Sequence, residues 1–187
     1  PARYPLAKTG KRKFDALYIA RITPFKRHEL AVKVKNLHLI GNYSEKEKEY
    51  FTQTIARFPD AVWSQKVTSF FIGRKICEAA CGLALSAIEG AMFSCGEYSL
   101  CGVPVVNTKN LGGRDTLLPE FAVRYAEDNA ASVAENVRYW VENPIPPEEI
   151  RDGFLRLALP QKEMVQDLVD SIAGKHLHLQ RDSGADE

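Results

Sequence analysis

The sequence predicts an α/β fold, a Rossmann-like doubly wound parallel sheet of about six strands with helices on both faces. Short apolar runs alternate with helical segments along most of the chain, and this alternation is typical of parallel sheets. The run CGLALS at 81–86 fits a strand buried on both faces. A second run, PVVN at 104–107, opens with a proline, which suits the first residue of a strand. A helix between two such strands forms a right-handed crossover.

The remaining elements follow from the same signals along the chain. Apolar runs bounded by turn residues predict the other four strands, at 14–20, 36–43, 61–64 and 122–126. Ser44 and Glu47 form a capping box at the start of one helix, and Gly102 can adopt the left-handed conformation that ends another. We expect a short helix after the first strand and longer helices at 44–58, 70–80, 91–101, from Asn129 or Ser132 to 142, at 148–157 and at 161–173.

A length of 187 residues suits one domain with a real core. Residues 1–13 contain two prolines and a glycine without apolar periodicity, so we expect the linker of an interdomain connection there. We expect the domain at 14–174 and a disordered tail at 175–187. The sequence has no apolar run of 18 residues and no visible secretory signal. Its four cysteines fit buried free thiols, and we expect the protein in the cytoplasm.

Charge is unevenly distributed, although the net charge is only +1. The first 35 residues contain ten Lys or Arg residues, with only Asp15 and Glu29 as acids. This basic lobe implies an anionic ligand, an anionic membrane face or an acidic neighbouring domain. The cysteines and histidines lack the spacing of a metal site, so we expect neither a metal ion nor a cofactor.

Two carboxylates, Glu89 and Glu97, bracket the start of the helix predicted at 91–101. Eight residues of helix rise about 12 Å, whereas the two carboxylates of a glycosidase lie about 5–9.5 Å apart. The spacing therefore favours one extended ligand held at two points. The helix N-terminus between the carboxylates offers free N–H groups to an anion. An ordinary amphipathic helix with a solvent-exposed Glu97 is the simpler interpretation.

Glu89, seven residues and Glu97, followed by CGVPVV at 101–106, resemble the signature of retaining glycosyltransferases of family 4. The resemblance covers residues 14–173 and only the C-terminal, donor-binding half of these GT-B enzymes. It implies transfer of a sugar from a UDP- or GDP-sugar with retention. In that family the second glutamate holds the ribose and the first contacts the donor sugar. From the free N–H groups of the helix N-terminus we expect the donor phosphates near the helix mouth, at Gly90, Ala91, Met92 and Phe93.

A basic loop follows the first predicted strand, where open α/β sheets bind ligands. Arg21 and Lys26 lie on it, and the two side chains can clamp a diphosphate. The loop is similar to the family's first phosphate motif, so we group both residues with Glu89 as the catalytic set. Ala20 and Arg27 depart from that motif, since glycine is usual at both positions. A solvated basic loop without a ligand is the alternative interpretation.

Three further loops complete the predicted site. Gly41 and Asn42 follow the second strand, and Lys66 and Val67 lie where the resemblance assigns the nucleotide base. Two adjacent glycines after the fifth strand permit close backbone approach to a ligand, and the resemblance puts them near the sugar and phosphate. This pair is Gly112 and Gly113. Arg114 and Asp115 beside it either pair with each other or contact a partner domain.

The sequence lacks GxGxxG, Walker and GxSxG motifs, which argues against a dehydrogenase, an NTPase and an α/β-hydrolase. We expect the donor domain of a glycosyltransferase, whose partners are a nucleotide-sugar and a missing N-terminal acceptor domain that can contact a membrane peripherally. This half alone is expected to bind donor without efficient turnover, and no nucleic acid is expected. The alternative is a non-catalytic nucleotide or nucleotide-sugar module that acts through a partner protein.

Overall fold

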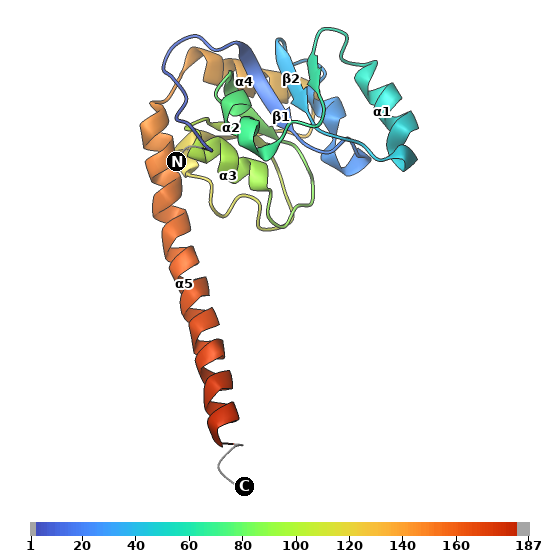
Figure 1. Cartoon of the computed structure of the whole chain (residues 1–187). Coiled ribbons are helices and arrows are strands. Elements are labelled where there is room, and N and C mark those ends of the chain that lie inside the picture. The colour runs from blue at the N-terminus through green and yellow to red at the C-terminus, as the bar shows by residue number, and fades with distance from the viewer. Residues whose placement is uncertain (1–2, 183–187) are drawn as a thin grey trace.

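The protein is represented by a computed structural model, of which residues 3–182 are described, with side chains up to Ala173. Six parallel strands form one sheet in the order β3-β2-β1-β4-β5-β6, with helices packed against it (Figure 1). The predicted fold class is confirmed, because this is a Rossmann-like sheet with the expected strand number. The strands are β1 (Phe14–Ile19), β2 (Leu37–Ile40), β3 (Val62–Ser64), β4 (Ala79–Ala84), β5 (Val105–Thr108) and β6 (Val123–Ala126).

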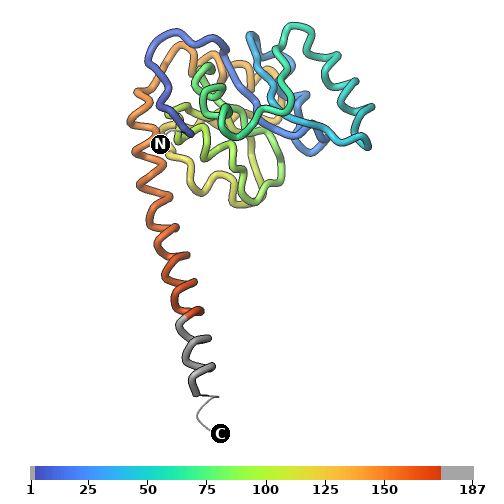
Figure 2. The backbone as a smooth tube through the Cα atoms, viewed as in Figure 1, coloured from blue at the N-terminus to red at the C-terminus, as the bar shows by residue number. Residues whose placement is uncertain are grey.

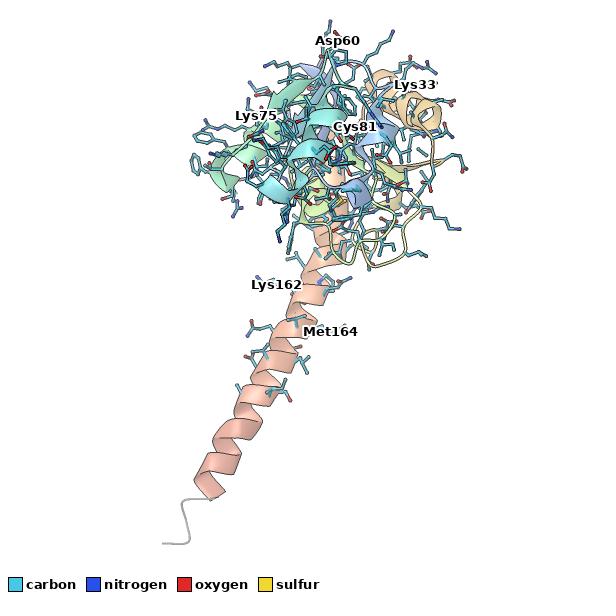
Figure 3. All side chains as sticks on the ribbon, turned by 90° about the vertical axis from the view of Figure 1, so that its right-hand side faces the viewer. Lys33, Asp60, Lys75, Cys81, Lys162 and Met164 are labelled. Atoms are coloured by element: carbon cyan, nitrogen blue, oxygen red, sulfur yellow. The ribbon has the colours of Figure 1, made fainter. Side chains whose placement is uncertain are left out.

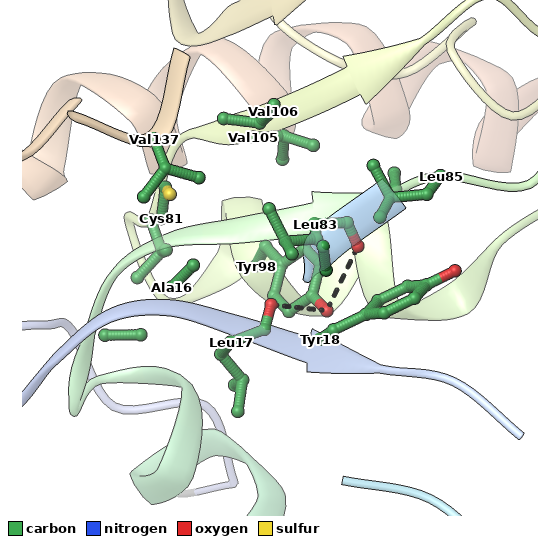
Figure 4. Close-up of a cluster of buried hydrophobic side chains, with 14 of the residues drawn as sticks. Ala16, Leu17, Tyr18, Cys81, Leu83, Leu85, Tyr98, Val105, Val106 and Val137 are labelled. Carbon is green, nitrogen blue, oxygen red and sulfur yellow. Dashed lines mark hydrogen bonds between the residues drawn. The ribbon is translucent and has the colours of Figure 1, made fainter. Parts of the chain in front are cut away.

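The central strands β1 and β4 form the middle of the core. Leu17 and Tyr18 of β1 and Leu83 of β4 are fully buried, as expected for a sheet covered on both faces. Tyr98 lies across both strands, and its hydroxyl accepts a hydrogen bond from the Ile19 N–H at 2.9 Å. The same hydroxyl is 3.5 Å from the carbonyl oxygens of Leu17 and Leu83 (Figure 4). One side chain thus joins β1 to β4 through backbone groups of both.

Four shorter helices pack around the sheet, namely α1 (Lys48–Ile55), α2 (Ser69–Ile76), α3 (Phe93–Leu100) and α4 (Ala130–Glu142). Helices α2 and α3 contact each other and β4, while α4 packs on β1, β4 and β5. Figure 1 shows α2 and α3 on one face and α4 on the other. Charged side chains such as Lys33, Asp60 and Lys75 point outward, whereas Cys81 lies inside (Figure 3).

Some boundaries differ from those predicted. The capping box is present, since Glu47 accepts from the Ser44 backbone N–H at 3.1 Å, but it opens a 3-10 turn before α1. The first connection contains two 3-10 helices, Pro24–Lys26 and His28–Ala31. They meet at Arg27, whose left-handed conformation prevents one continuous helix. Helix α3 begins at Phe93 rather than 91, so the helix mouth lies two residues later than expected.

The two helices predicted at 148–157 and 161–173 are one helix, α5 (Pro147–Asp182), with Pro160 inside it. The prediction was wrong because an internal proline removes one backbone donor while neighbouring turns keep their bonds. Its first turns are buried at Ile150 and Phe154. The following turns up to Ala173, including Lys162 and Met164, extend away from the sheet (Figures 2 and 3). The helix enters the stretch 175–187, where we expected a disordered tail, and residues 183–187 lie outside the described residues.

Residues 3–7, which we call the N-terminal strap, lie against the domain although they fall within the expected linker. The Ala7 N–H donates to the Cys101 carbonyl at 2.9 Å, and Ala7 itself is buried. The Cys77 thiol donates to the Pro5 carbonyl at 3.3 Å. The strap therefore packs beside the C-terminal ends of α2 and α3. Within the described part of the chain, no helix has an apolar stretch long enough to cross a membrane.

Candidate functional site

The candidate site lies where the strand order reverses, between the carboxyl ends of β1 and β4. Open α/β sheets bind ligands at this point because adjacent connections leave on opposite faces and open a crevice. A hollow of about 550 Å³ is present here. Most residues predicted for the site line it, namely Arg21, Lys26, Gly41, Asn42, Lys66, Val67, Glu89, Ala91, Met92, Phe93 and Glu97.

Lys26 and Glu89 form an ion pair across this point, in which the Lys26 ammonium donates to the carboxylate. The two side chains are only 11% and 18% exposed. A charge this far from water needs a partner, because an unpaired buried charge is costly. Each residue thus neutralises the other.

Arg27 fixes the loop that contains Lys26. Its backbone is left-handed, with φ of 52°, a conformation costing roughly 1 kcal/mol for a residue with a Cβ. Its guanidinium donates to the Leu85 carbonyl at 2.6 Å and to the Thr108 hydroxyl at 2.7 Å, and it pairs with Asp128 at 3.0 Å. These bonds connect the basic loop to the ends of β4 and β5. They hold an arginine in a backbone conformation that glycine adopts more readily.

Arg21 lies on the rim of the hollow rather than beside Lys26. Its side chain is 58% exposed and pairs with Glu47 at 3.2 Å. Glu47 also accepts from the Ser44 hydroxyl at 2.6 Å. The hydrogen bonds from Ser44 are the main reason that the pKa of Glu47 is lowered, and Arg21 contributes less. In this structure, then, the two cations predicted to clamp a diphosphate each pair with a carboxylate.

Glu97 lies on α3, in its second turn, with one oxygen already engaged. The Tyr4 hydroxyl donates to Glu97 Oε1 at 2.8 Å. Burial, followed by this hydrogen bond, raises the pKa of Tyr4. Glu89 precedes α3 by four residues, so the separation of about 12 Å that we derived from an unbroken helix does not apply to this pair.

The loops after β2 and β3 form one wall of the hollow. A Cβ on Gly41 would lie 1.8 Å from the Ala20 carbonyl oxygen, so only glycine fits there. Asn42 Oδ1 accepts from the Lys66 N–H at 2.9 Å. This hydrogen bond joins the two loops, and Lys66 adopts a left-handed φ of 52° beside it.

Gly112 and Gly113 do not line the hollow. They contact the segment 85–92 between β4 and α3, which we call the Glu89 loop. A Cβ on Gly112, whose φ is 147°, would lie 2.2 Å from the Glu89 carbonyl oxygen, and one on Gly113 would approach Gly90. The Leu111 N–H donates to Ala87 at 2.8 Å. The glycine pair therefore permits two loops to pack backbone against backbone. Gly90 likewise belongs to this contact rather than to the lining of the hollow.

Arg114 and Asp115 pair with each other, which decides between the two predicted alternatives. Arg114 is 3% exposed and donates to Asp115 at 2.8 Å and to the Ser86 carbonyl at 2.6 Å. Asn107 donates to the same carboxylate at 2.7 Å. This buried network fixes the ends of β4 and β5 below the Glu89 loop.

His28 lies under the basic loop and is fully buried. Its ring packs 4.8 Å from the Tyr18 ring, and neither ring nitrogen has a hydrogen-bond partner among the described residues. Burial, with a smaller effect of Lys26, lowers the pKa of His28 to about 4. The imidazole is thus neutral near neutral pH and acts as part of the core.

A larger hollow, of about 830 Å³, lies at the opposite, amino-terminal ends of the strands. It is lined by residues 9–15 before and within β1 and by residues 140–146 around the end of α4. None of the predicted site residues faces it. No group of three or more potential metal ligands occurs within the described residues.

Sequence reasoning missed Tyr4, Arg27 as a brace, and Glu47 as the partner of Arg21. Tyr4 falls in a stretch without periodicity, so no local pattern connects it with Glu97. The bonds of Arg27 reach residues far along the chain, which spacing does not reveal. Glu47 was recognised only as a cap.

No protein-family model matches this sequence, and no curated protein matches it in sequence. Solved structures do match in fold. They include HepE from Anabaena in complex with UDP (TM-score 0.70, 16% identity, covering 87% of this chain and 49% of that chain). Sucrose-phosphate synthase from Thermosynechococcus elongatus matches with a TM-score of 0.67 and 18% identity, covering 91% of this chain and 47% of that one.

AviGT4, a glycosyltransferase involved in avilamycin A biosynthesis, matches with a TM-score of 0.70 and 21% identity, covering 92% of this chain and 56% of that one. This chain thus spans about half the length of these proteins. Its fold is that of the C-terminal half of GT-B glycosyltransferases.

Proposed function

We propose that this chain is the donor-binding domain of a retaining glycosyltransferase of family 4, which transfers a sugar from a UDP- or GDP-sugar to an acceptor. The main support is the Lys26–Glu89 pair at the point where the strand order reverses, with Glu97 lining the same hollow. A cation, a sugar-side carboxylate and a ribose-side carboxylate are the groups that a nucleotide-sugar requires. The fold match to HepE, whose structure contains UDP, further supports this proposal.

The diphosphate binds between Lys26 and the mouth of α3, with Arg21 at the rim. The backbone N–H groups of Phe93 and Ser94 lie in the first turn of α3, and N–H groups at a helix N-terminus favour anions. Glu97 accepts from the ribose hydroxyls, and the base lies against Lys66 and Val67. Glu89 faces the sugar, while Gly112 and Gly113 act indirectly by holding its loop.

Donor binding requires the Lys26–Glu89 pair to separate. A diphosphate carries more negative charge than one carboxylate, so it attracts the Lys26 ammonium more strongly. Glu89 is then released to accept hydrogen bonds from sugar hydroxyls. A carboxylate there also stabilises positive charge that develops on the sugar during transfer.

Transfer itself requires an acceptor-binding half that the described residues do not contain. The projecting part of α5 supports such a partner domain, because Met164, Leu168 and Ile172 expose 70%, 60% and 50% of their surfaces. We place the complete enzyme in the cytoplasm, with peripheral membrane contact through its other half. This half alone binds donor without efficient turnover.

Titration calorimetry with UDP, GDP and ADP, each free and as a sugar conjugate, tests the proposal. One nucleotide should bind, and Glu97→Ala should weaken it by about 1.5–3 kcal/mol, the usual effect of losing a charged hydrogen bond. Glu142→Ala, at the end of α4, is the matched control and should change nothing. Absence of binding by every nucleotide would refute the proposal, and equal affinity for free and sugar-bearing forms would favour a nucleotide module.

A further inference from the structure

Tyr4 connects the N-terminal strap to the proposed ribose carboxylate. Its hydroxyl donates to Glu97 Oε1 at 2.8 Å, across 93 positions of the chain. A phenol donor to a carboxylate is a charge-assisted hydrogen bond, which is stronger and more directional than a neutral one. The strap therefore contributes a contact to the site although it lies far from it in sequence.

The Tyr4 backbone is fixed independently of this hydrogen bond. Arg151 of α5 donates to the Tyr4 carbonyl at 2.8 Å and to the Leu100 carbonyl at 2.5 Å. Arg3 donates to the Ser69 carbonyl at 3.2 Å, and its guanidinium lies 5.3 Å from the centre of the Tyr4 ring. The phenol thus extends from a strap that is bound to α2, α3 and α5.

Glu97 lies between two hollows. One is the proposed donor site, and the other, of about 550 Å³, is lined by Tyr4, Met92 and Leu118 among others. Tyr4, which lines only the second of these hollows, donates to Oε1. Its hydrogen bond restricts the rotation of the carboxylate and leaves Oε2 for a ligand in the donor site.

We propose that Tyr4 is a positioning residue for ribose recognition, and this inference rests on the proposed donor-binding function. By holding Oε1, the phenol presents the carboxylate of Glu97 in one orientation before the nucleotide arrives. A ligand that meets a pre-oriented acceptor loses less free energy to side-chain ordering. Tyr4 therefore affects affinity only through the ribose hydroxyls.

The test measures binding of UDP and of 2′,3′-dideoxy-UDP by calorimetry, or of the GDP pair if GDP is the ligand. Four proteins are compared, namely wild type, Tyr4→Phe, Glu97→Ala, which removes the acceptor of the Tyr4 hydroxyl, and the double variant. Tyr139→Phe is the matched control, because it removes a phenol from α4, away from the hollow. Thermal unfolding verifies that Tyr4→Phe keeps the strap in place.

We expect Tyr4→Phe to weaken UDP binding about fivefold, with no effect on the dideoxy ligand and no further loss when Glu97 is already alanine. Unchanged UDP affinity, or an equal loss for both ligands, would overturn the inference while leaving the donor site intact. A loss that persists in the Glu97→Ala background would also overturn it, since the strap would then act through the fold. If wild type binds no nucleotide, the proposed function fails and this inference fails with it.

Discussion

Replacing His28 by leucine should make the protein less sensitive to acid. Burial lowers the pKa of His28 from its ordinary value of 6.5 to about 4. The unfolded chain takes up a proton as the pH falls through 6.5, whereas the folded protein excludes it until about pH 4. In this window the unfolded state binds more protons, so the free energy of unfolding falls as the pH falls.

The magnitude follows from the difference between the two pKa values. It corresponds to about 3 kcal/mol of stability that is complete above pH 6.5 and lost by about pH 4. His28→Leu should lack this loss, because no imidazole remains under the basic loop. His38, whose pKa burial also lowers, contributes equally to both proteins and cancels in the comparison.

Urea unfolding of both proteins between about pH 7 and about pH 4.5 measures the effect. As the pH falls over this range, wild type should lose about 2–3 kcal/mol more stability than His28→Leu. Parallel curves would refute the reasoning. They would mean that water reaches the ring or that the loop opens to let the imidazole charge.

Three further predictions concern the candidate site. Lys26→Gln should weaken the binding of nucleoside diphosphate about tenfold and leave the binding of nucleoside nearly unchanged. Calorimetry should also show a smaller dependence of the affinity on salt. Equal losses for both ligands would contradict a phosphate contact. Glu89→Gln should strengthen the binding of free nucleoside diphosphate, because Lys26 loses its competing partner. It should also abolish any preference for the sugar-bearing form. Weaker diphosphate binding would contradict the proposal that Lys26 leaves Glu89 for the diphosphate. Arg27→Gly should lower the free energy of unfolding by about 2 kcal/mol, since two charged hydrogen bonds outweigh the relief of a left-handed backbone; a stabilised variant in urea unfolding would disprove the bracing role.

The sheet and the location of the candidate site were predictable because both depend on local patterns. Apolar runs mark the strands, and in a parallel sheet all loops after strand ends meet at one edge. The residues after β1, β2, β3 and β4 therefore had to converge, whatever their detailed conformations. Lys26 and Glu89 share a hollow for this reason.

What could not be predicted depends on contacts between distant segments. Tyr4 meets Glu97 only because the strap folds back onto α2 and α3. The continuity of α5 through Pro160 depends on the balance of many helix bonds against one lost donor. The sequence predicted that Gly112 and Gly113 approach the ligand, whereas their close contact is with the Glu89 loop.

The pairing of β1 with β4 has a consequence for the order of folding. Ala16 pairs with Leu37 on one side and with Cys81 on the other, so the second pairing closes a loop about three times as long. Closing it costs about 1 kcal/mol more in chain entropy, which favours late formation.

The contacts that assemble the candidate site cross this same junction, including Lys26 with Glu89, Arg27 with Leu85, and Ile19 with Tyr98. Ligand binding should therefore recover after the helical signal during refolding. The candidate site is complete only after β1 and β4 have paired.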